Sequence, residues 1–217
     1  MTLSEENYLK AIFHLSKDFD SGVSTNAIAE KIEAKASSVT DMLKKLSEKK
    51  LVDYQKYQGV SLTGKGRKIA TNIIRKHRLW EVFLVEKLGF TWDEVHDVAE
   101  QLEHIKSEKL VDELDNFLGN PTIDPHGDPI PDKEGNLAAT HNTLLSELKT
   151  GEKCVCIGVK DSSSEFLKYL DKNDISLGRK IRVLNKETFD GSMRIRMKKN
   201  EFTISQQIAS NLYVKKQ

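Results

Sequence analysis

The spacing of apolar residues changes once along this chain of 217 residues, and that change limits the folds open to it. Up to about residue 118, apolar side chains recur at the three- and four-residue intervals of amphipathic helices. From Gly151 onwards they alternate with polar residues in "KCVCIGV", "KIRVLN", "SMRIRMK" and "EFTIS", as in half-buried strands. The sequence therefore predicts a helical N-terminal part followed by a small, separate β-rich domain.

The first 66 residues contain three predicted helices and one predicted hairpin. An amphipathic helix over 4–17 comes first, and two short helices follow within 24–50, where Ser24 or Thr25 can cap the first of them. The stretch "LVDYQKYQGVSLTGKG" then has the pattern of two strands with a tip near Gly59. Helix, turn, helix and hairpin in this order are typical of a winged helix-turn-helix, whose second short helix enters the major groove of DNA.

The net charge of +1 conceals an uneven distribution of charge. Residues 41–79 hold eleven Lys and Arg against three Asp and Glu, whereas residues 80–140 hold four Lys against fifteen Asp and Glu. The chain as a whole is therefore not a general binder of nucleic acid. Its first segment favours polyanions and its second favours cations.

The predicted DNA contacts lie along the second short helix and at the hairpin tip. They are Lys35, Ser37, Ser38, Thr40, Lys44, Lys45, Lys56 and Tyr57. The small hydroxyl side chains of "KASSVT" stand at the helix end that reaches base edges or nearby backbone, and the lysines that follow are expected to touch phosphates. An ordinary solvated helix face remains the alternative interpretation.

Two further helices and a loop follow the hairpin. The pattern predicts a long helix over 66–88 and a second helix from Thr91 or Asp93 to about Leu118. All four prolines of the chain then fall between residues 121 and 131, within "GNPTIDPHGDPIPDKEG". Because proline fixes one backbone dihedral, this segment is expected to be a constrained loop.

The second of these helices carries a polar cluster within "VHDVAEQLEH". Its members, His96, Glu100, Glu103 and His104, fall within an arc of about 100° on a helix, and the preceding helix carries His77 and Glu81 at i, i+4 spacing. Converging carboxylates and imidazoles repel one another or bind protons until a cation joins them, so the pattern favours a divalent metal site. Because the donors are N and O atoms, a hard ion such as Mn²⁺ suits them. An acidic, solvated face is the alternative.

The stretch "RKHRLWEVFLVEKLGFTWDEVHDVAEQLEHIKSEKLVDEL" closely resembles the diphtheria toxin repressor family of iron- and manganese-dependent repressors. The similarity covers nearly the whole chain. It implies a mainly α fold with β structure, in which a winged helix-turn-helix (1–72) precedes a helical metal-binding and dimerisation domain (73–140). A linker (141–150) and a C-terminal SH3-like β-barrel of the FeoA type (151–217) complete the expected organisation.

The resemblance also implies a function. A homodimer activated by metal would bind palindromic operator DNA and repress genes for metal uptake, with Mn²⁺ favoured, Fe²⁺ possible and other divalent ions substituting in vitro. We expect no enzymatic activity and no small organic substrate, because H-E-x-x-H, a Gly-rich phosphate loop and a nucleophile elbow are absent. The alternatives are a metal-handling enzyme or chaperone that uses the winged helix for protein contacts, and a metal-independent DNA-binding regulator.

Location follows from two further features of the sequence. The chain has no apolar run of about 18 residues, so we expect no association with a membrane. Its only cysteines, Cys154 and Cys156, are too close for an ordinary disulfide. Both features fit a cytoplasmic protein.

Two metal sites are implied by the resemblance. The primary site is matched by Glu100, Glu103, His104 and, from the first helix, Asn7. The ancillary site is matched by His77, Glu81 and His96. In relatives with this loop a residue matching His126 also takes part, and Asp124 stands where some carry a cysteine. Glu100 follows the manganese-dependent branch, whereas Asn7 is neutral where that branch is acidic. A metal that bridged Asn7 to the acidic helix would fix the DNA-binding unit on the dimerisation unit, and without it the carboxylates are expected to repel one another.

Overall fold

A computed structural model describes residues 1–16, 22–55, 58–138 and 143–217. The chain forms two compact units, which share its sequence in alternating segments. The first unit comprises Met1–Trp80, Ala99–Phe117 and Ile130–Leu137, and the second comprises Glu81–Val98, Leu118–Pro129 and Ala138–Gln217. Within the described ranges, no helix has the length and apolar character needed to cross a bilayer.

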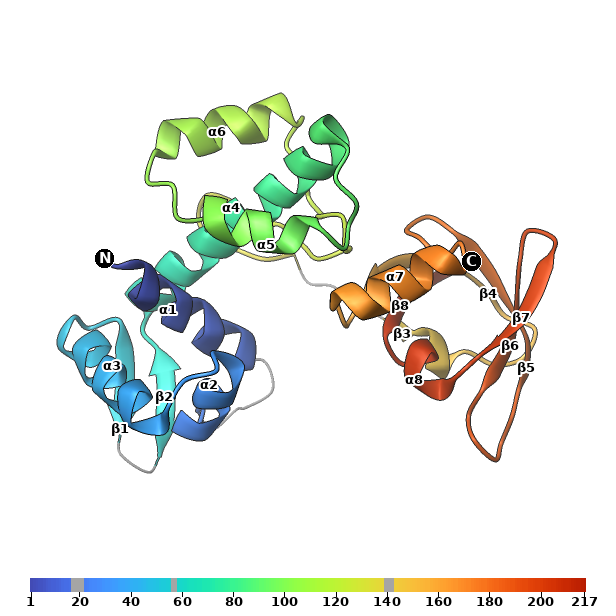
Figure 1. Cartoon of the computed structure of the whole chain (residues 1–217), viewed down its shortest axis with the longest axis horizontal. Helices are drawn as coiled ribbons and strands as arrows, with labels where there is room; N and C mark the ends of the chain where they lie inside the picture. The colour runs from blue at the N-terminus through green and yellow to red at the C-terminus, as the bar shows by residue number, and fades with distance from the viewer. Residues whose placement is uncertain (17–21, 56–57, 139–142) are drawn as a thin grey trace. The chain divides into compact units, whose positions relative to one another are not determined.

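The first unit begins with the predicted winged helix-turn-helix (Figure 1). Its elements are α1 (Leu3–Leu15), α2 (Thr25–Lys31), α3 (Ala36–Glu48) and the antiparallel pair β1 (Val52–Gln55) and β2 (Gly59–Leu62). A capping box joins Thr2 and Glu5 at the start of α1, and the Ser24 hydroxyl accepts a hydrogen bond at the start of α2. Fully buried Ile12 and Leu43 lie in its core, so burial of the predicted apolar faces accounts for this part of the fold.

A long helix, α4 (Gly64–Leu88), follows the hairpin, close to its predicted bounds. A Cβ atom at Gly66 would lie 1.9 Å from the backbone oxygen of Leu51, so only glycine permits the helix to start this close to the strand.

The predicted continuous helix ending near Leu118 is wrong. Instead, α5 (Val95–Leu102) and α6 (Glu108–Phe117) are separated by a turn at residues 103–107. The turn leaves the Glu103 side chain completely buried, and the Ser107 hydroxyl accepts a hydrogen bond from the backbone of Leu110 where α6 begins. Apolar spacing continues across the break, so periodicity could not reveal it, although Ser107 was a usable cap signal.

The second unit contains the β-rich domain as a six-stranded antiparallel sheet in the order β3-β8-β4-β5-β6-β7. Its strands are β3 (Thr143–Leu144), β4 (Lys153–Val159), β5 (Lys180–Lys186), β6 (Met193–Met197), β7 (Asn200–Ile204) and β8 (Leu212–Lys216), with helices α7 (Ser164–Lys172) and α8 (Gln206–Ala209). The four predicted strands are confirmed. Strands β3 and β8 were not predicted, and β8 lies between β3 and β4.

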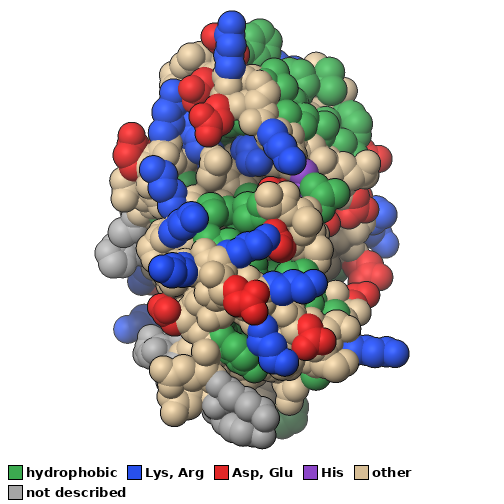
Figure 2. Space-filling model, turned by 90° about the vertical axis from the view of Figure 1, so that its left-hand side faces the viewer, with side chains coloured by type: hydrophobic (Ala, Val, Ile, Leu, Met, Phe, Trp, Pro, Cys, Tyr) green, Lys and Arg blue, Asp and Glu red, His purple; other side chains and the backbone are tan. Residues whose placement is uncertain are grey.

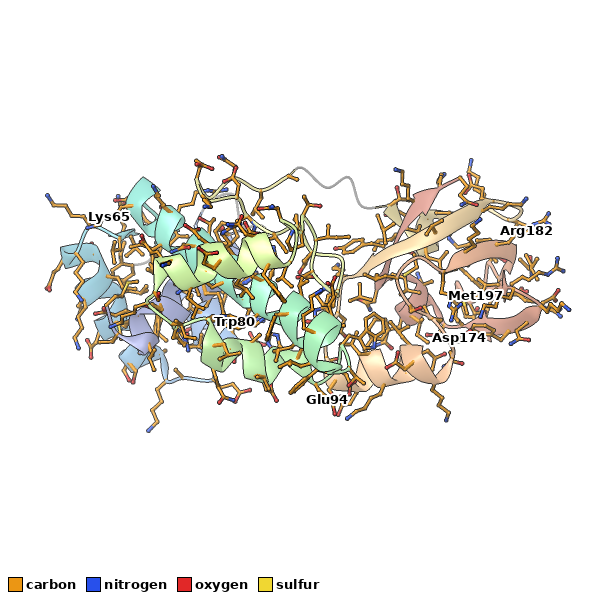
Figure 3. All side chains as sticks on the ribbon, turned by 90° about the horizontal axis from the view of Figure 1, so that it is seen from above. Lys65, Trp80, Glu94, Asp174, Arg182 and Met197 are labelled. Carbon is orange, nitrogen blue, oxygen red and sulfur yellow. The ribbon has the colours of Figure 1, made fainter. Side chains whose placement is uncertain are left out.

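The predicted alternation of strand residues is visible in the side chains. Met197 is buried in the domain core, whereas Arg182 is exposed at its periphery (Figure 3). Cys154 and Cys156 both belong to the core, and burial raises the pKa of Cys154 to about 12 and that of Cys156 to about 11. Their thiols stay protonated at neutral pH, so they serve as small apolar side chains.

The proline-rich loop is anchored on strand β4. The backbone N–H of Val159 donates to the carbonyl oxygen of His126 at 2.9 Å. Gly127 has φ +89°, and a Cβ atom there would lie 2.1 Å from the backbone oxygen of Ile157. The Asp124 carboxylate accepts hydrogen bonds from the backbone of His126 and Asp128 at 2.8 and 2.9 Å. The loop therefore holds Asp124 and His126 in fixed positions.

Candidate metal sites and DNA-binding face

Polar side chains from α1, α4 and the end of α5 gather within the first unit. This first-helix cluster consists of Glu6, Lys10, His77, Glu100, Glu103 and His104. The ammonium of Lys10 lies 2.8 and 2.9 Å from the two carboxylate oxygens of Glu103 and 3.1 Å from Oε1 of Glu100. Helix α1 is thereby joined to residues 90 and 93 positions later in the chain.

Two histidines complete the first-helix cluster. His77 Nδ1 lies 2.6 Å from Oε2 of Glu103, and His104 Nδ1 lies 2.6 Å from Oε2 of Glu6. Burial lowers the pKa of Lys76, and the charges of Glu6 and Glu103 oppose that shift, which places a second lysine in the field of the same carboxylates. The ammonium of Lys10 therefore reduces the repulsion expected between Glu100 and Glu103.

Asn7, the predicted first-helix ligand, is exposed, and its role as a ligand stays a prediction. Glu6 and Lys10, which the sequence argument missed, contact the cluster directly. They stand one helical turn apart, and Glu6 is buried despite its charge. Their i, i+4 spacing was visible in the sequence, but their partners are about ninety residues away.

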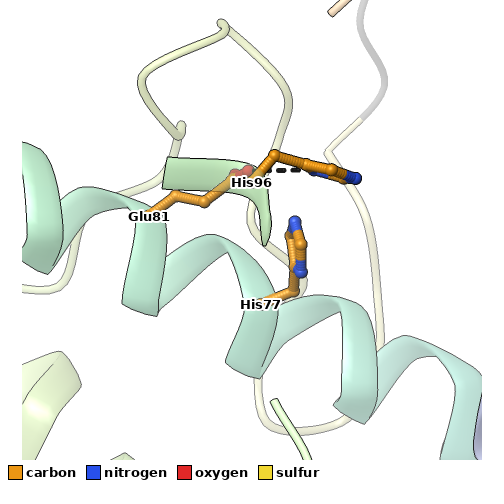
Figure 4. A group of neighbouring side chains, drawn as sticks. All are labelled: His77, Glu81 and His96. Carbon is orange, nitrogen blue, oxygen red and sulfur yellow. Dashed lines mark ion pairs between the residues drawn. The ribbon is translucent and has the colours of Figure 1, made fainter. Parts of the chain in front are cut away.

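A second set of donors lies around the proline-rich loop, in the second unit. This loop cluster consists of Glu81 from α4, His96 from α5, and Asp124 and His126. Ligand atoms of Glu81, Asp124 and His126 all lie within 4.8 Å of one another, and all three residues are buried. Nδ1 atoms of His96 and His126 each lie 3.6 Å from Oε1 of Glu81. Figure 4 shows the Glu81–His96 pair, with His77 one turn earlier on the same helix α4.

The environment of His126 fixes both its tautomer and its charge. Its Nε2 atom lies 2.7 Å from the carbonyl oxygen of Trp92, which can only accept, so Nε2 carries a hydrogen and Nδ1 faces Glu81. Burial disfavours the charged ring, but the hydrogen bond and charge of Glu81, with Asp124 and the Trp92 carbonyl, raise the pKa of His126 to about 9. At neutral pH the loop cluster therefore holds a proton on Nδ1, the atom best placed to bind a metal.

The two clusters differ in their fit to a metal ion. In the loop cluster, two carboxylates and an imidazole nitrogen converge on one point, and that donor set suits Mn²⁺ or Fe²⁺. In the first-helix cluster, both oxygens of Glu103 already accept from the Lys10 ammonium. The loop cluster can take a metal ion once His126 releases its Nδ1 proton, whereas the first-helix cluster would have to displace the Lys10 ammonium.

The predicted DNA-binding residues in the described ranges lie on or next to α3. Lys35, Ser37, Ser38, Lys44 and Lys45 are exposed. Thr40 is half-buried, and its hydroxyl donates to the backbone oxygen of Ala36. Lys56 and Tyr57 lie outside the described residues. Figure 2 shows Lys and Arg side chains spread over one face of the molecule, with Asp and Glu between them.

Comparison with known proteins agrees with this arrangement of elements. Residues 1–60 match the family described as iron dependent repressor, N-terminal DNA binding domain, and residues 63–132 match its metal binding and dimerisation domain. Residues 143–216 match the FeoA domain. A solved manganese-dependent transcriptional repressor in complex with manganese is 35% identical, with a TM-score of 0.89, over 98% of this chain and 100% of that chain. The chain belongs to the diphtheria toxin repressor family.

Curated members of this family show how far the similarity extends. The iron-dependent repressor IdeR of Mycobacterium leprae (strain TN) is 36% identical over 126 residues, which are 58% of this chain and 54% of the relative. The diphtheria toxin repressor of Corynebacterium jeikeium (strain K411) is 30% identical over 144 residues, or 66% of this chain and 60% of the relative. The chain thus spans little more than half the length of these two proteins. The predicted family and fold class are confirmed.

Proposed function

We propose that this chain is a cytoplasmic, homodimeric, metal-dependent transcriptional repressor of metal-uptake genes that acts on a palindromic operator. Its family and the winged helix-turn-helix support the role in transcription, and the donor set of the loop cluster supports the dependence on metal. We favour Mn²⁺, with Fe²⁺ as the alternative and other divalent ions able to substitute in vitro, because every donor is N or O. The observation that supports this proposal most strongly is that ligand atoms of Glu81, Asp124 and His126 lie within 4.8 Å of one another.

DNA binding is assigned to the first 72 residues. Lys35, Ser37 and Ser38 stand at the start of α3, where side chains reach base edges in winged helices, and Lys44 and Lys45 follow on its exposed surface. The lysines supply charge for phosphate contacts, which position a protein on DNA without reading its sequence. Lys56 and Tyr57 are proposed as further phosphate contacts from the sequence alone.

Dimerisation is assigned to the helical part, residues 73–140. Helix α6 exposes Leu110 and Phe117, whose exposed fractions are 42% and 65%. They are seven residues apart and so share one face of the helix. Large apolar side chains exposed together mark an interaction surface. A twofold dimer built on this face would present two recognition helices to successive major grooves, about 34 Å apart.

Metal binding is assigned first to Glu81, His96, Asp124 and His126, with His77 on the adjacent turn of α4. A bound divalent ion would supply positive charge that these donors share. The Trp92 carbonyl keeps the hydrogen on Nε2 of His126, so Nδ1 can release its proton and turn its lone pair to the ion. Gly127 allows the loop to pack closely on β4, and this contact fixes the positions of Asp124 and His126.

The switch is a population shift. An ion held by the loop cluster joins α4 and α5 to the anchored loop and favours the conformations in which they are joined. If DNA binds those conformations better, then metal raises the affinity for operator, and operator raises the affinity for metal by the same factor. A linked affinity change of roughly 5- to 150-fold is typical of such coupling.

The test is DNA binding with and without metal. A duplex selected from a random pool in the presence of Mn²⁺ is titrated with the protein by fluorescence anisotropy, in Mn²⁺ and in chelator. We expect the selected duplex to contain a palindrome and to bind roughly 5- to 150-fold more tightly in Mn²⁺. Equal affinity in both conditions would indicate a metal-independent regulator. Failure to select any sequence would indicate a metal-handling enzyme or chaperone.

A further inference from the structure

We propose that Lys10 is a resident cation of the first-helix cluster, whose ammonium holds helix α1 to Glu100 and Glu103 in the place where a metal ion was expected. The link between α1 and the end of α5 would then form without metal. The consequence for regulation, that metal control resides in the loop cluster alone, rests on the proposed function.

The geometry accounts for all three hydrogens of the Lys10 ammonium. An ammonium carries three donors, and three carboxylate oxygens lie within 3.1 Å of Nζ. The side chain of Lys10 is 14% exposed and that of Glu103 is 1% exposed, so this ion pair is removed from solvent screening. By contrast, the Glu100 side chain is 50% exposed and contributes less.

Two further contacts within the chain occupy ligand atoms of the cluster. Oε2 of Glu103 accepts from Nδ1 of His77 as well as from Lys10, since a carboxylate can only accept. His104 Nδ1 is paired with Glu6. An ion bound to Glu103 would therefore compete with these donors for the carboxylate oxygens.

Charge repulsion also opposes the binding of a metal ion at Glu103. A divalent ion bound to Glu103 would stand within a few ångströms of the ammonium, and like charges at that separation repel strongly in a buried site. Entry of metal thus requires Lys10 to move away. Removing one partner of a buried ion pair leaves the other uncompensated, which is among the more costly changes in a protein interior. Asn7 offers only a neutral oxygen in return.

The experiment replaces the charge of Lys10 and follows metal-free stability and bound Mn²⁺. We expect Lys10→Met to lower the Tm of the metal-free protein by roughly 5–15 °C, because Glu103 loses its main partner. Lys31→Met, a change at an exposed lysine on α2, is the matched control and should leave the Tm nearly unchanged. The double variant Lys10→Met with Glu103→Gln should recover part of the loss.

Free Mn²⁺ is measured by electron paramagnetic resonance, and the bound Mn²⁺ is the total added minus the free ion. In a His126→Ala background, which removes a ligand of the loop cluster, we expect the chain with Lys10 intact to bind no tight Mn²⁺. Lys10→Met in that background should gain one ion per chain, and Glu103→Gln should abolish it. The proposal is overturned if His126→Ala alone retains a tight ion that Glu103→Gln removes, a result that does not depend on the folding of any Lys10 variant.

A second variant separates charge from shape. Lys10→Arg keeps the positive charge and is expected to hold the metal-free Tm within a few degrees of the parent while still excluding Mn²⁺ from Glu103. If Lys10→Met and Lys31→Met change the Tm equally, and neither changes the Mn²⁺ count, the resident-cation role is rejected. None of these readouts uses DNA, so they stand apart from the test of the repressor function.

Discussion

The first-helix cluster and the loop cluster contain the same kinds of donor and are neutralised in different ways. In the first, the positive charge comes from the ammonium of Lys10, which is bound covalently to the chain. In the second, it comes from a proton on His126, held by Glu81 and Asp124. A proton can be exchanged for a metal ion in place, whereas a lysine can give up its site only by moving. Donor type alone therefore does not identify a metal site.

The largest loss of stability is expected from a substitution that disturbs the packing of the proline-rich loop on β4. At Gly127 the backbone has a φ of +89°, and a Cβ atom would lie 2.1 Å from the backbone oxygen of Ile157. Gly127→Ala should therefore lower the free energy of unfolding by about 3 kcal/mol. Gly119→Ala is the matched control, because φ is +77° there but no atom lies within 4 Å of the added Cβ. It should cost about 1 kcal/mol. Urea unfolding of the metal-free proteins measures both, and equal losses would contradict the proposed anchoring on β4.

The second prediction concerns the pH dependence of stability that arises from the proton on His126. Because the pKa of His126 is raised to about 9, its charged form stabilises the fold. That contribution is fully present below an unfolded pKa of roughly 6.5 and is lost as the pH rises towards 9. We expect metal-free protein to lose roughly 1–3 kcal/mol over this interval. His126→Gln should flatten the profile in urea unfolding, and an unchanged slope in that variant would remove His126 from the account.

The smallest effect on stability is expected at Lys44, an exposed lysine, in contrast to the largely buried Lys10. Lys44 is exposed and its only described ion pair is with Asp41 on the same helix, at 3.4 Å, so Lys44→Ala should leave the Tm unchanged within about 1 °C. It should weaken binding to the selected duplex and to random DNA alike, and reduce the slope of log affinity against log salt by roughly 1. Anisotropy titrations at several salt concentrations measure this. A loss confined to the selected duplex would mean that Lys44 reads bases.

Sequence reasoning predicted the elements that depend on local pattern. The winged helix follows from apolar periodicity, from the Ser24 cap and from the hairpin signal, and all three are satisfied within single elements. Strand β8 was missed because its sequence, between residues 212 and 216, gives little alternation beyond two buried positions. Its place beside β4 is set by tertiary packing.

The candidate sites were less predictable, and for a physical reason. A helical projection grouped Glu103 with His96, but α5 ends at Leu102 and Glu103 turns to face α1 instead. The Lys10–Glu103 pair joins residues 93 positions apart, and no spacing rule reaches that far. The loop cluster was expected through resemblance to a family, while the anchoring role of Gly127 emerged only from the backbone contacts of β4.

The most direct test of the central claim compares one change in each cluster. Operator binding is measured for His126→Ala and for Glu103→Gln, each in Mn²⁺ and in chelator, on the duplex selected with the parent protein. The account predicts that His126→Ala loses the Mn²⁺ enhancement of affinity, whereas Glu103→Gln retains it although its metal-free form melts at a lower temperature. The opposite pattern, with Mn²⁺ still enhancing binding by His126→Ala and no longer by Glu103→Gln, would place the switch in the first-helix cluster and contradict the account.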